Sequence, residues 1–342
     1  MTLDVLLVQP GFGERGGVTV DVLNLADGLK RSNHRARTAG SLKQLISELR
    51  SHTPAVVHVF GCLPSPTIFG AMALARLRGL PLVWTPIFNP IRRHTWQGYR
   101  LLRAMEAFDA VAPHAARFVD AVIAATPVEA SFFQAIGAKR VELIPPGVDA
   151  PGPPATEEAV SRFRSSVGLS AGPVVLAVGR DNSRKALPFG LECFARLRTR
   201  LRDAQLLLVG PDRTFFGAQQ AGVTCPGWLD QPSMALAYQT ADVLFVPSLY
   251  EGLPRAVIEA WRWGTPVVAT DRVALAPMIA NGAGRVVAYG RPTEAAIALE
   301  SLLTDSADRA RLGRAGRRFV VSRFLTPRLN KQTIGLYREL SK

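Results

Sequence analysis

The chain has 342 residues, of which 48% are hydrophobic and 20% are charged, a composition typical of a globular protein and not of a disordered or fibrous one. Its length suits two domains of roughly 150 residues each. The three cysteines are widely spaced and form no CxxC pair, which argues against a disulfide framework and a zinc site. Together with a start that leads directly into a strand pattern, this predicts a cytoplasmic protein.

The formal net charge is +14, and much of it lies in the tail, where residues 305–342 hold ten Lys or Arg and three Asp or Glu. Such a surplus attracts anions, either nucleotide phosphates or an anionic membrane surface, and it also fits ordinary solvated helix faces. Aromatic residues do not alternate with the basic ones, and no DNA-reading motif occurs. We therefore expect no nucleic-acid partner.

Short apolar runs in the first half of the chain predict buried parallel strands. They lie at residues 4–9, 55–60, 82–85, 121–126 and 141–144. Between the first two, Val18, Val22, Leu25 and Leu29 recur at helical spacing. The apolar stretch 64–87 is interrupted by Arg76 and Arg78, and it therefore predicts a helix and a strand, not a membrane span. This alternation predicts a Rossmann-like domain over residues 1–148.

A Pro- and Gly-rich stretch follows, and it predicts a linker over residues 149–163. A second alternation then predicts strands at 173–179, 205–210, 242–248, 266–270 and 285–289, within a domain over 164–325. The tail predicts two helices, the last of them (326–342) packing back on the first domain. The predicted fold class is α/β, with two Rossmann-like doubly wound parallel-sheet domains facing a cleft that receives ligands at the carboxyl ends of the strands.

The strongest motif is PSLYEGLPRAVIEAWRWGTPVVATD, residues 247–271. It predicts a strand end, a turn and a helix that begins near Pro254, whose N-terminus would be an anion site. Gly252 and Leu253 lie in the turn, and Arg255 adds positive charge. Glu251 can accept hydrogen bonds from sugar hydroxyls, and Glu259 can hold a hydroxyl pair such as a ribose diol. For an isolated pair of glutamates, a helix cap and a solvated side chain would be the simpler interpretation.

This segment resembles the C-terminal signature of glycosyltransferase family 4, the retaining GT-B enzymes, in the EGLP variant of the E-x7-E pattern. Three further segments match the family in the right order: ERGGVTV with Gly16 and Gly17, IPPGVD at 144–149, and GRDNSRKAL with Arg180 and Lys185. The resemblance covers nearly the whole chain. It implies a retaining glycosyltransferase that moves a sugar from a UDP- or GDP-sugar to an acceptor hydroxyl.

Site roles follow from charge and from the resemblance. Arg180 and Lys185 together can neutralise a diphosphate, and we expect them, with Glu251, to be the catalytic residues. The resemblance implies that Gly16 and Gly17 offer backbone N–H groups to the same diphosphate. Trp228 and Leu229, in CPGWLD, fall where the family holds the base, although Trp228 fits an ordinary packed aromatic equally well.

The implied reaction is a front-face displacement in which the departing diphosphate accepts the proton of the acceptor hydroxyl. Stabilisation of the leaving-group charge would then dominate catalysis. No Asp-x-Asp metal motif occurs in the sequence. We expect neither a metal nor a cofactor apart from the donor substrate.

One family feature is missing. Family members often carry a His after the fourth strand of the first domain, where this chain has Ile87 in LVWTPIFNP. Asn89 and His94 are the acceptor-side candidates, and a surface role without function also fits His94. His58 is better explained as a core histidine. The acceptor is expected to be a cell-envelope lipid or glycan or a natural product. The basic side chains of the first domain would suit an anionic membrane, and they would suit an anionic or natural-product acceptor equally well; they are Arg92, Arg93, Arg100 and Arg103.

Two other functions remain as alternatives. A nucleotide-sugar epimerase of the same fold would need ionisable acid–base residues around the sugar. A basic nucleic-acid-binding protein would show steep salt dependence of binding. A dinucleotide oxidoreductase is weaker still: GFGERG at residues 11–16 has the G-x-G-x-x-G spacing after the first strand, but that spacing alone is a weak signal.

Overall fold

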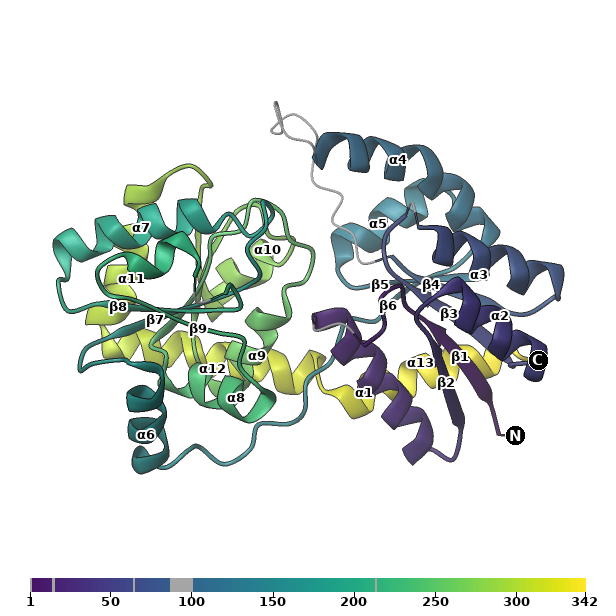
Figure 1. Ribbon diagram of the computed structural model, residues 1–342, viewed down its shortest axis with the longest axis horizontal. Helices are drawn as coiled ribbons and strands as arrows, with labels where there is room; N and C mark the ends of the chain where they lie inside the picture. Colours follow the sequence, from purple (N-terminus) through teal and green to yellow (C-terminus); the bar gives the residue numbers. More distant parts are fainter. Residues whose placement is uncertain (1, 14–15, 64, 87–100, 213) are drawn as a thin grey trace. The chain divides into compact units, whose positions relative to one another are not determined.

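The computed structural model describes residues 2–13, 16–63, 65–86, 101–212 and 214–342. The chain divides into two compact units, Met1–Gly147 with Leu325–Lys342 and Val148–Phe324 (Figure 1). Each unit contains a six-stranded sheet with helices on both faces. All neighbouring strands run parallel. The predicted class, two Rossmann-like doubly wound domains, is confirmed.

The sheet of the first unit has the order β2-β1-β3-β4-β5-β6. Its strands are β1 (Asp4–Val8), β2 (Arg35–Ala39), β3 (Val56–Phe60), β4 (Leu82–Thr85), β5 (Ala121–Ala124) and β6 (Val141–Leu143). The five apolar runs of the sequence form β1, β3, β4, β5 and β6. Strand β2 was not predicted, because RARTA is an edge strand that lacks the continuous apolar run of a central one.

Helices cover both faces of this sheet (Figure 1). On one face lie α2 (Leu42–Ser51), α3 (Pro66–Leu77), α4 (Leu101–Phe118) and α5 (Pro127–Ala135). On the other lie α1 (Gly17–Arg31) and α13 (Thr326–Leu340). The side chains of Ser41, Ser65 and Thr126 cap α2, α3 and α5 by accepting a backbone N–H bond from the first turn. The apolar stretch 64–87 thus forms α3 and β4.

Helix α13 is part of the first unit although it comes last in the chain. Leu329, Ile334, Leu336 and Tyr337 are buried in the core that also contains α1. Asn330 Nδ2 donates to the carbonyl oxygen of Asn24 at 3.0 Å. Gly28 makes this close packing possible, since a Cβ there would lie 2.1 Å from Asn330 Nδ2.

The sheet of the second unit has the order β12-β11-β10-β7-β8-β9. Its strands are β7 (Val174–Val178), β8 (Gln205–Val209), β9 (Val223–Gly227), β10 (Val243–Val246), β11 (Val267–Thr270) and β12 (Gly284–Val287). Strand β9 was not predicted, again because it is an edge strand, partly polar and interrupted by Pro226. The chain proceeds in one direction from β7 and in the other from β10, so the switch point of the sheet lies between these two neighbours.

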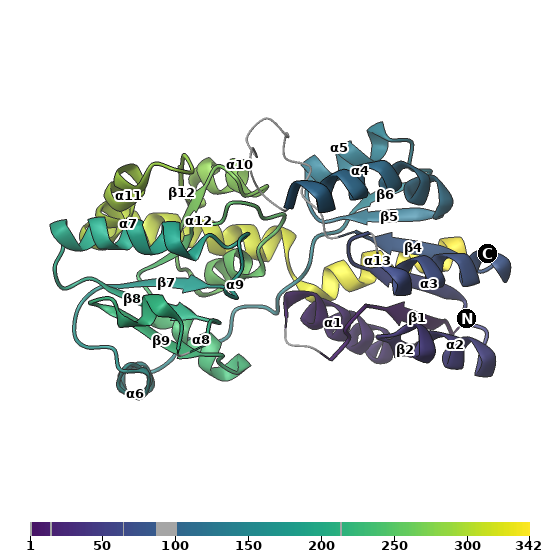
Figure 2. The same ribbon diagram turned by 45° about the horizontal axis from the view of Figure 1, so that its top comes forward.

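Helices α7 (Leu187–Arg200) and α11 (Pro292–Thr304) pack together on one face of this sheet, and α8 (Gln231–Thr240) and α9 (Arg255–Trp263) lie on the other (Figure 2). Helix α6 (Glu157–Val167) packs against α8. Three short helical segments, η2 (Phe216–Gln219), α10 (Ala276–Met278) and η3 (Ile279–Ala283), complete the unit.

The predicted linker over 149–163 is wrong in its second half, because α6 begins at Glu157 and belongs to the second unit. Thr156 caps the helix by accepting a hydrogen bond from the N–H of Ala159 at 3.2 Å. The acidic Glu157 and Glu158 occupy the first turn, where negative charge stabilises a helix.

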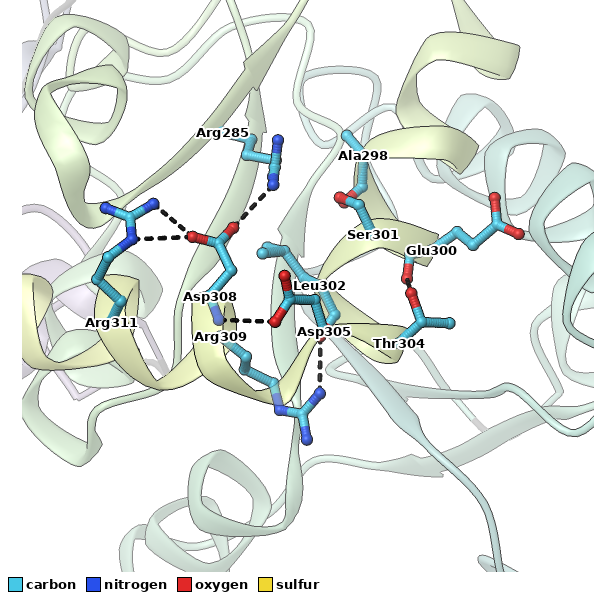
Figure 3. A network of polar contacts seen from close by, with 10 residues as sticks. All are labelled: Arg285, Ala298, Glu300, Ser301, Leu302, Thr304, Asp305, Asp308, Arg309 and Arg311. Atoms are coloured by element: carbon cyan, nitrogen blue, oxygen red, sulfur yellow. Dashed lines mark hydrogen bonds and ion pairs between the residues drawn. The ribbon is translucent and has the colours of Figure 1, made fainter.

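Part of the basic surplus of the tail is paired within helix α12 (Ser306–Arg323) (Figure 3). Asp308 lies between Arg285, at 2.8 Å, and Arg311, whose Nε is 3.0 Å away. Partial burial opposes ionisation, yet the bonds and charges of Arg311 and Arg285 hold the pKa of Asp308 below its usual value. Arg314, Arg317 and Arg318 are exposed. Within the described ranges, no helix is long and apolar enough to cross a membrane.

Candidate functional site

The loops after β7 and β10 meet at the carboxyl edge of the second sheet, because these two strands are neighbours. Lys185 Nζ lies 2.7 Å from Glu251 Oε1, and the two side chains are 21% and 14% exposed. The backbone joins the same loops, since Leu249 N–H donates to the carbonyl oxygen of Arg184 at 2.9 Å. Two predicted catalytic residues, 66 positions apart in the sequence, are therefore in direct contact.

Lys185 reaches Glu251 by lying across Gly179, the residue that follows β7. A Cβ at Gly179 would be 2.8 Å from Lys185 Cδ, so only glycine leaves this path open. Gly210, at the end of β8, has φ +116°, and a Cβ there would lie 2.6 Å from the carbonyl oxygen of Gly179. The N–H of Gly210 in turn donates to the carbonyl oxygen of Gly227, in β9, at 3.0 Å. The ends of β7, β8 and β9 thus form a row of glycines over which a ligand can approach the backbone.

The turn that carries Glu251 is also held by the loop after β11. Ala274 N–H donates to the carbonyl oxygen of Glu251 at 2.9 Å, and Glu251 N–H donates to that of Arg272 at 3.4 Å. Sequence reasoning missed Arg184 and Arg272, because both act here through backbone carbonyls, which residue type does not reveal. It also missed Gly179 and Gly210, although a glycine after each apolar run was a visible signal.

Helix α9 begins where the sequence predicted, with Pro254 at its N-cap. Within the described structure no side chain caps this helix, and its first turn contains no acidic residue. The partial positive charge of the N-terminus is therefore not offset by a carboxylate from its own first turn. Gly252 and Leu253 form the turn between Glu251 and this helix end.

Glu259 is held from both sides. Arg255 Nε lies 3.1 Å from Glu259 Oε1, and the hydroxyl of Tyr238 donates to Oε2 at 2.8 Å. Burial, followed by the charge of Glu259, raises the pKa of Tyr238 well above its usual value, so the phenol stays protonated and donates. Arg255 was expected to add positive charge at the helix N-terminus, and its guanidinium pairs with Glu259. Tyr238 was missed because a tyrosine within a helical apolar pattern looks like a core residue.

The remaining predicted residues of this unit lie along the same sheet edge. Arg180 lies just beyond Gly179 after the end of β7 and is exposed. Trp228 and Leu229 follow β9, two strands away from β7 and hence about 10 Å along the sheet. Trp228 is 47% exposed, so the alternative that it is an ordinary packed aromatic does not fit.

In the first unit, Gly16 and Gly17 lie at the start of α1, after β1 and at the switch point between β1 and β3. His58 is confirmed as a core histidine: Nδ1 lies 2.5 Å from Tyr337 Oη and Nε2 lies 2.7 Å from Thr85 Oγ1. Its burial lowers its pKa to about 3. The acceptor-side candidates Asn89 and His94 lie outside the described residues, as do Arg92, Arg93, Arg100 and the side chain of Arg103.

The part of the chain that the structure describes contains no group of three or more His, Cys, Asp or Glu able to hold a metal ion. The charged groups gathered at the sheet edge are instead Lys185, Arg180, Arg255 and the two glutamates. This arrangement can bind an anion beside hydroxyl-bearing groups, because cations and carboxylates alternate within one row of loops.

Two family models match the chain. The model described as "Glycosyl transferase 4-like domain" matches residues 9–147, and that described as "Glycosyl transferases group 1" matches residues 172–305. Each match falls within one of the two units. The second includes Arg180, Lys185, Glu251 and Glu259.

Curated relatives share under a third of their residues with this chain. It is 28% identical over 304 residues to the MMP α-(1→4)-mannosyltransferase of Mycolicibacterium hassiacum, covering 82% of this chain and 70% of that one. It is 29% identical over 194 residues to the α-D-kanosaminyltransferase of Streptomyces kanamyceticus, covering 54% of this chain and 50% of that one. The alignment therefore spans only half the length of the second relative.

Solved structures of similar fold match nearly the whole chain. Sucrose-phosphate synthase from Thermosynechococcus elongatus superposes with a TM-score of 0.81 at 21% identity, covering 99% of both chains. Anabaena HepE, solved in complex with UDP-glucose, superposes with a TM-score of 0.77 at 16% identity, covering 98% of this chain and 100% of that one. At these identities the likeness shows the fold.

Proposed function

We propose that this chain, which belongs to the GT-B glycosyltransferases described by the group 1 and 4-like domain models, is a retaining enzyme that transfers a sugar from a UDP- or GDP-sugar to an acceptor hydroxyl. The observation that carries the proposal is the Lys185–Glu251 contact at the switch point of the second sheet. Ligands of open α/β sheets bind at such points. The UDP-glucose bound to the Anabaena structure supports the donor class.

The donor diphosphate would lie over the row of glycines, between Lys185, Arg180 and the N-terminus of α9. Two side-chain cations and a helix N-terminus supply positive charge to this edge, which is why we propose that the protein neutralises the diphosphate without a metal or another cofactor. Glu251 then accepts hydrogen bonds from the sugar hydroxyls and Glu259 from the ribose. The exposed face of Trp228 and the backbone of Leu229 would hold the base.

The reaction proceeds by displacement on one face of the sugar. The bond between the anomeric carbon and the diphosphate oxygen breaks, and a bond to the acceptor oxygen forms on the same side. The hydroxyl proton passes to the departing phosphate oxygen, so no protein base is needed. Lys185, Arg180 and the N-terminus of α9 stabilise the negative charge that develops on the leaving group.

The first unit would receive the acceptor, which we propose to be a cell-envelope lipid or glycan or a natural product. The backbone N–H groups of Gly16 and Gly17, at the start of α1, are suited to a phosphate oxygen. Asn89 and His94 remain our sequence-based candidates for contacts on the acceptor side. The surplus of basic residues suits an acceptor presented on an anionic membrane, with the protein bound peripherally at the cytoplasmic face.

A screen of UDP- and GDP-sugars tests the proposal. We expect at least one sugar nucleotide to raise the unfolding temperature and to be consumed in the presence of an acceptor. The anomeric configuration of the product, read by NMR, should match that of the donor. Inversion would overturn the retaining mechanism, and isomerisation of the free donor without an acceptor would identify an epimerase instead.

Two substitutions test the site itself. Lys185→Ala and Glu251→Ala should each abolish transfer while the fold, followed by circular dichroism, stays intact. Lys30→Ala serves as the control, because Lys30 lies on the surface of α1 and is 64% exposed. Retained turnover in either site variant would show that these residues do not carry the reaction.

A further inference from the structure

Both carboxylate oxygens of Glu259 are already in use before any ligand binds. Arg255 Nε lies 3.1 Å from Oε1, and the Tyr238 hydroxyl donates to Oε2 at 2.8 Å. The Arg255 and Glu259 side chains are 12% and 22% exposed, and Tyr238 as a whole is 2% exposed. A glutamate on a helix surface is ordinarily free to change rotamer. Here donors from two different helices, α8 and α9, fix it.

We propose that Tyr238 is a positioning residue for the nucleoside of the donor: with Arg255, it orients the Glu259 carboxylate so that one remaining lone pair on each oxygen accepts a hydrogen bond from one hydroxyl of the ribose diol. The inference rests on the proposed function, because it assumes a nucleotide ligand at this edge. Tyr238 is buried behind Glu259, and we do not expect it to touch the ligand.

The chemistry of the three groups supports this role. An ionised carboxylate accepts up to about four hydrogen bonds, two of which are taken, which leaves one site on each oxygen. Arg255 compensates the negative charge that would otherwise repel a nearby diphosphate. Because burial keeps the Tyr238 phenol protonated, Glu259 must remain the acceptor in that bond. The carboxylate is then suited to ligand groups that donate, as hydroxyls do, and not to groups that only accept.

Tyr238 can hold this position because its own helix is fixed. Thr265 Oγ1 donates to the carbonyl oxygen of Tyr238 at 2.7 Å, a bond that ties the end of α8 to the segment before β11. At the other end of α8, Asp230 caps the helix by accepting from Ser233 N–H at 2.9 Å. That cap follows directly after Trp228 and Leu229, so one helix begins at the proposed base site and ends at the proposed ribose site.

Tyr238→Phe removes only the phenol oxygen and tests the inference. Calorimetry would measure the Kd of UDP and of GDP for the wild type and the variant, together with the 2′-deoxy form of the nucleotide that binds. We expect Tyr238→Phe to weaken that ribonucleotide about tenfold, which corresponds to about 1.4 kcal/mol, and to weaken the 2′-deoxy nucleotide less, because that form keeps only one of the two hydroxyls that bind Glu259. In turnover assays the donor KM should rise while kcat changes little, as expected for a group that binds far from the reacting carbon.

A double variant distinguishes the orientation of Glu259 by Tyr238 from a general disturbance of the fold. In a Glu259→Gln background, adding Tyr238→Phe should cause no further loss of affinity, because both changes act through the same carboxylate. Tyr337→Phe is the matched control, since Tyr337 is also buried and hydrogen-bonded but lies in the first unit. It should leave nucleotide affinity unchanged.

The outcomes separate this inference from the proposed function. A wild type that binds neither UDP nor GDP would overturn the proposed function and this inference with it. A wild type that binds one of them while Tyr238→Phe binds equally well, or loses both nucleotide forms equally, would overturn the inference alone. The preference for ribose can be measured on the wild type alone. An equal Kd of the wild type for the ribo and 2′-deoxy forms would also overturn the inference.

Discussion

The Lys185–Glu251 pair defines the candidate site at the level of single residues. Both side chains are largely buried, and the two opposite charges lie 2.7 Å apart, so each stabilises the other. The carboxylate keeps the ammonium at the end of β7, in a position where a diphosphate would compete for it. The pair is thus expected to contribute to stability and to donor binding at once, and these two effects can be separated.

Lys185→Met should lower the free energy of unfolding by about 1–3 kcal/mol, because it removes the cation that lies 2.7 Å from a Glu251 carboxylate only 14% exposed. Adding Glu251→Gln should restore most of that loss, since the carboxylate charge that faced Lys185 is gone, but it should not restore transfer. Urea unfolding and a turnover assay on the same preparations measure both quantities. If the double variant regained turnover, the cation would not be what the reaction needs.

His58 predicts a pH dependence of stability in the first unit. Its folded pKa, about 3, lies below the ordinary 6.5, so the unfolded chain binds a proton in this interval that the folded one excludes. Stability is therefore full above about pH 6.5 and is lost as pH falls toward the folded value, by up to about 1.4 kcal/mol per pH unit.

Unfolding of the wild type and of His58→Gln, compared between pH 7 and pH 4, measures this contribution. His34 stays in both proteins, and its lowered pKa therefore cancels in the difference. We expect a shallower pH slope for His58→Gln, together with a lower stability at pH 7 because the bonds to Tyr337 and Thr85 change. Parallel pH profiles for the two proteins would show that His58 is not the titrating group.

At the level of elements, the strand-to-helix loops of the second unit decide where the charged side chains lie. Gly179 and Gly210 directly follow the neighbouring strands β7 and β8, yet an added Cβ would meet different atoms at the two positions. At Gly179 it would meet the flexible Lys185 side chain, 2.8 Å from Cδ, whereas at Gly210 it would meet a backbone carbonyl oxygen at 2.6 Å. Only the second obstacle requires the backbone to move.

Gly179→Ala should therefore displace Lys185 and lower kcat/KM by about 10²-fold or more, the scale on which loss of one transition-state donor acts. We expect its unfolding temperature to stay close to that of the wild type. Gly210→Ala should lower stability by about 1–3 kcal/mol, because its φ of +116° is also unfavourable for alanine. Thermal unfolding and kinetics of the two variants test the contrast, and equal stability losses would contradict it.

The sequence predicted the central strands of both sheets because strands buried on both faces appear as continuous apolar runs. It failed at β2 and β9, which are edge strands with a polar or interrupted pattern. It also failed at α6, because the Pro- and Gly-rich residues before this helix predicted a linker that continued through it. In each case the deciding contribution came from packing partners far away in the sequence, which a local pattern does not contain.

At the level of the whole molecule, the chain returns at its end to the unit in which it began. Helix α13 supplies core residues to the first unit, and Leu336 is 3% exposed there. Leu336→Ala should lower the free energy of unfolding by about 2–5 kcal/mol. Leu77→Ala, on the surface of the same unit and at a residue 83% exposed, should change it by less than about 0.5 kcal/mol. Similar losses in the two variants, measured by urea unfolding, would contradict this role of α13.

The candidate site could be predicted in part. Arg180, Lys185, Glu251 and Glu259 were named from charge, spacing and family resemblance, and the structure joins Lys185 to Glu251 directly. The pairing of Arg255 with Glu259 and the support from Tyr238 could not be predicted, because both depend on how α8 packs against α9. The backbone hydrogen bonds that hold the Glu251 turn could not be predicted either, because every residue type has the same backbone carbonyl group.

The most direct test of the account is the binding of a nucleoside diphosphate at the edge of the second sheet. Calorimetry with UDP and with GDP would compare the wild type, Arg180→Ala/Lys185→Ala, and the control Arg314→Ala/Arg317→Ala, whose residues are exposed on α12. We predict that the wild type and the control bind one of the two nucleotides alike and that the site variant binds it at least about 100-fold more weakly, a loss of about 2.8 kcal/mol. Undiminished binding to the site variant, or binding lost equally in the control, would contradict the account.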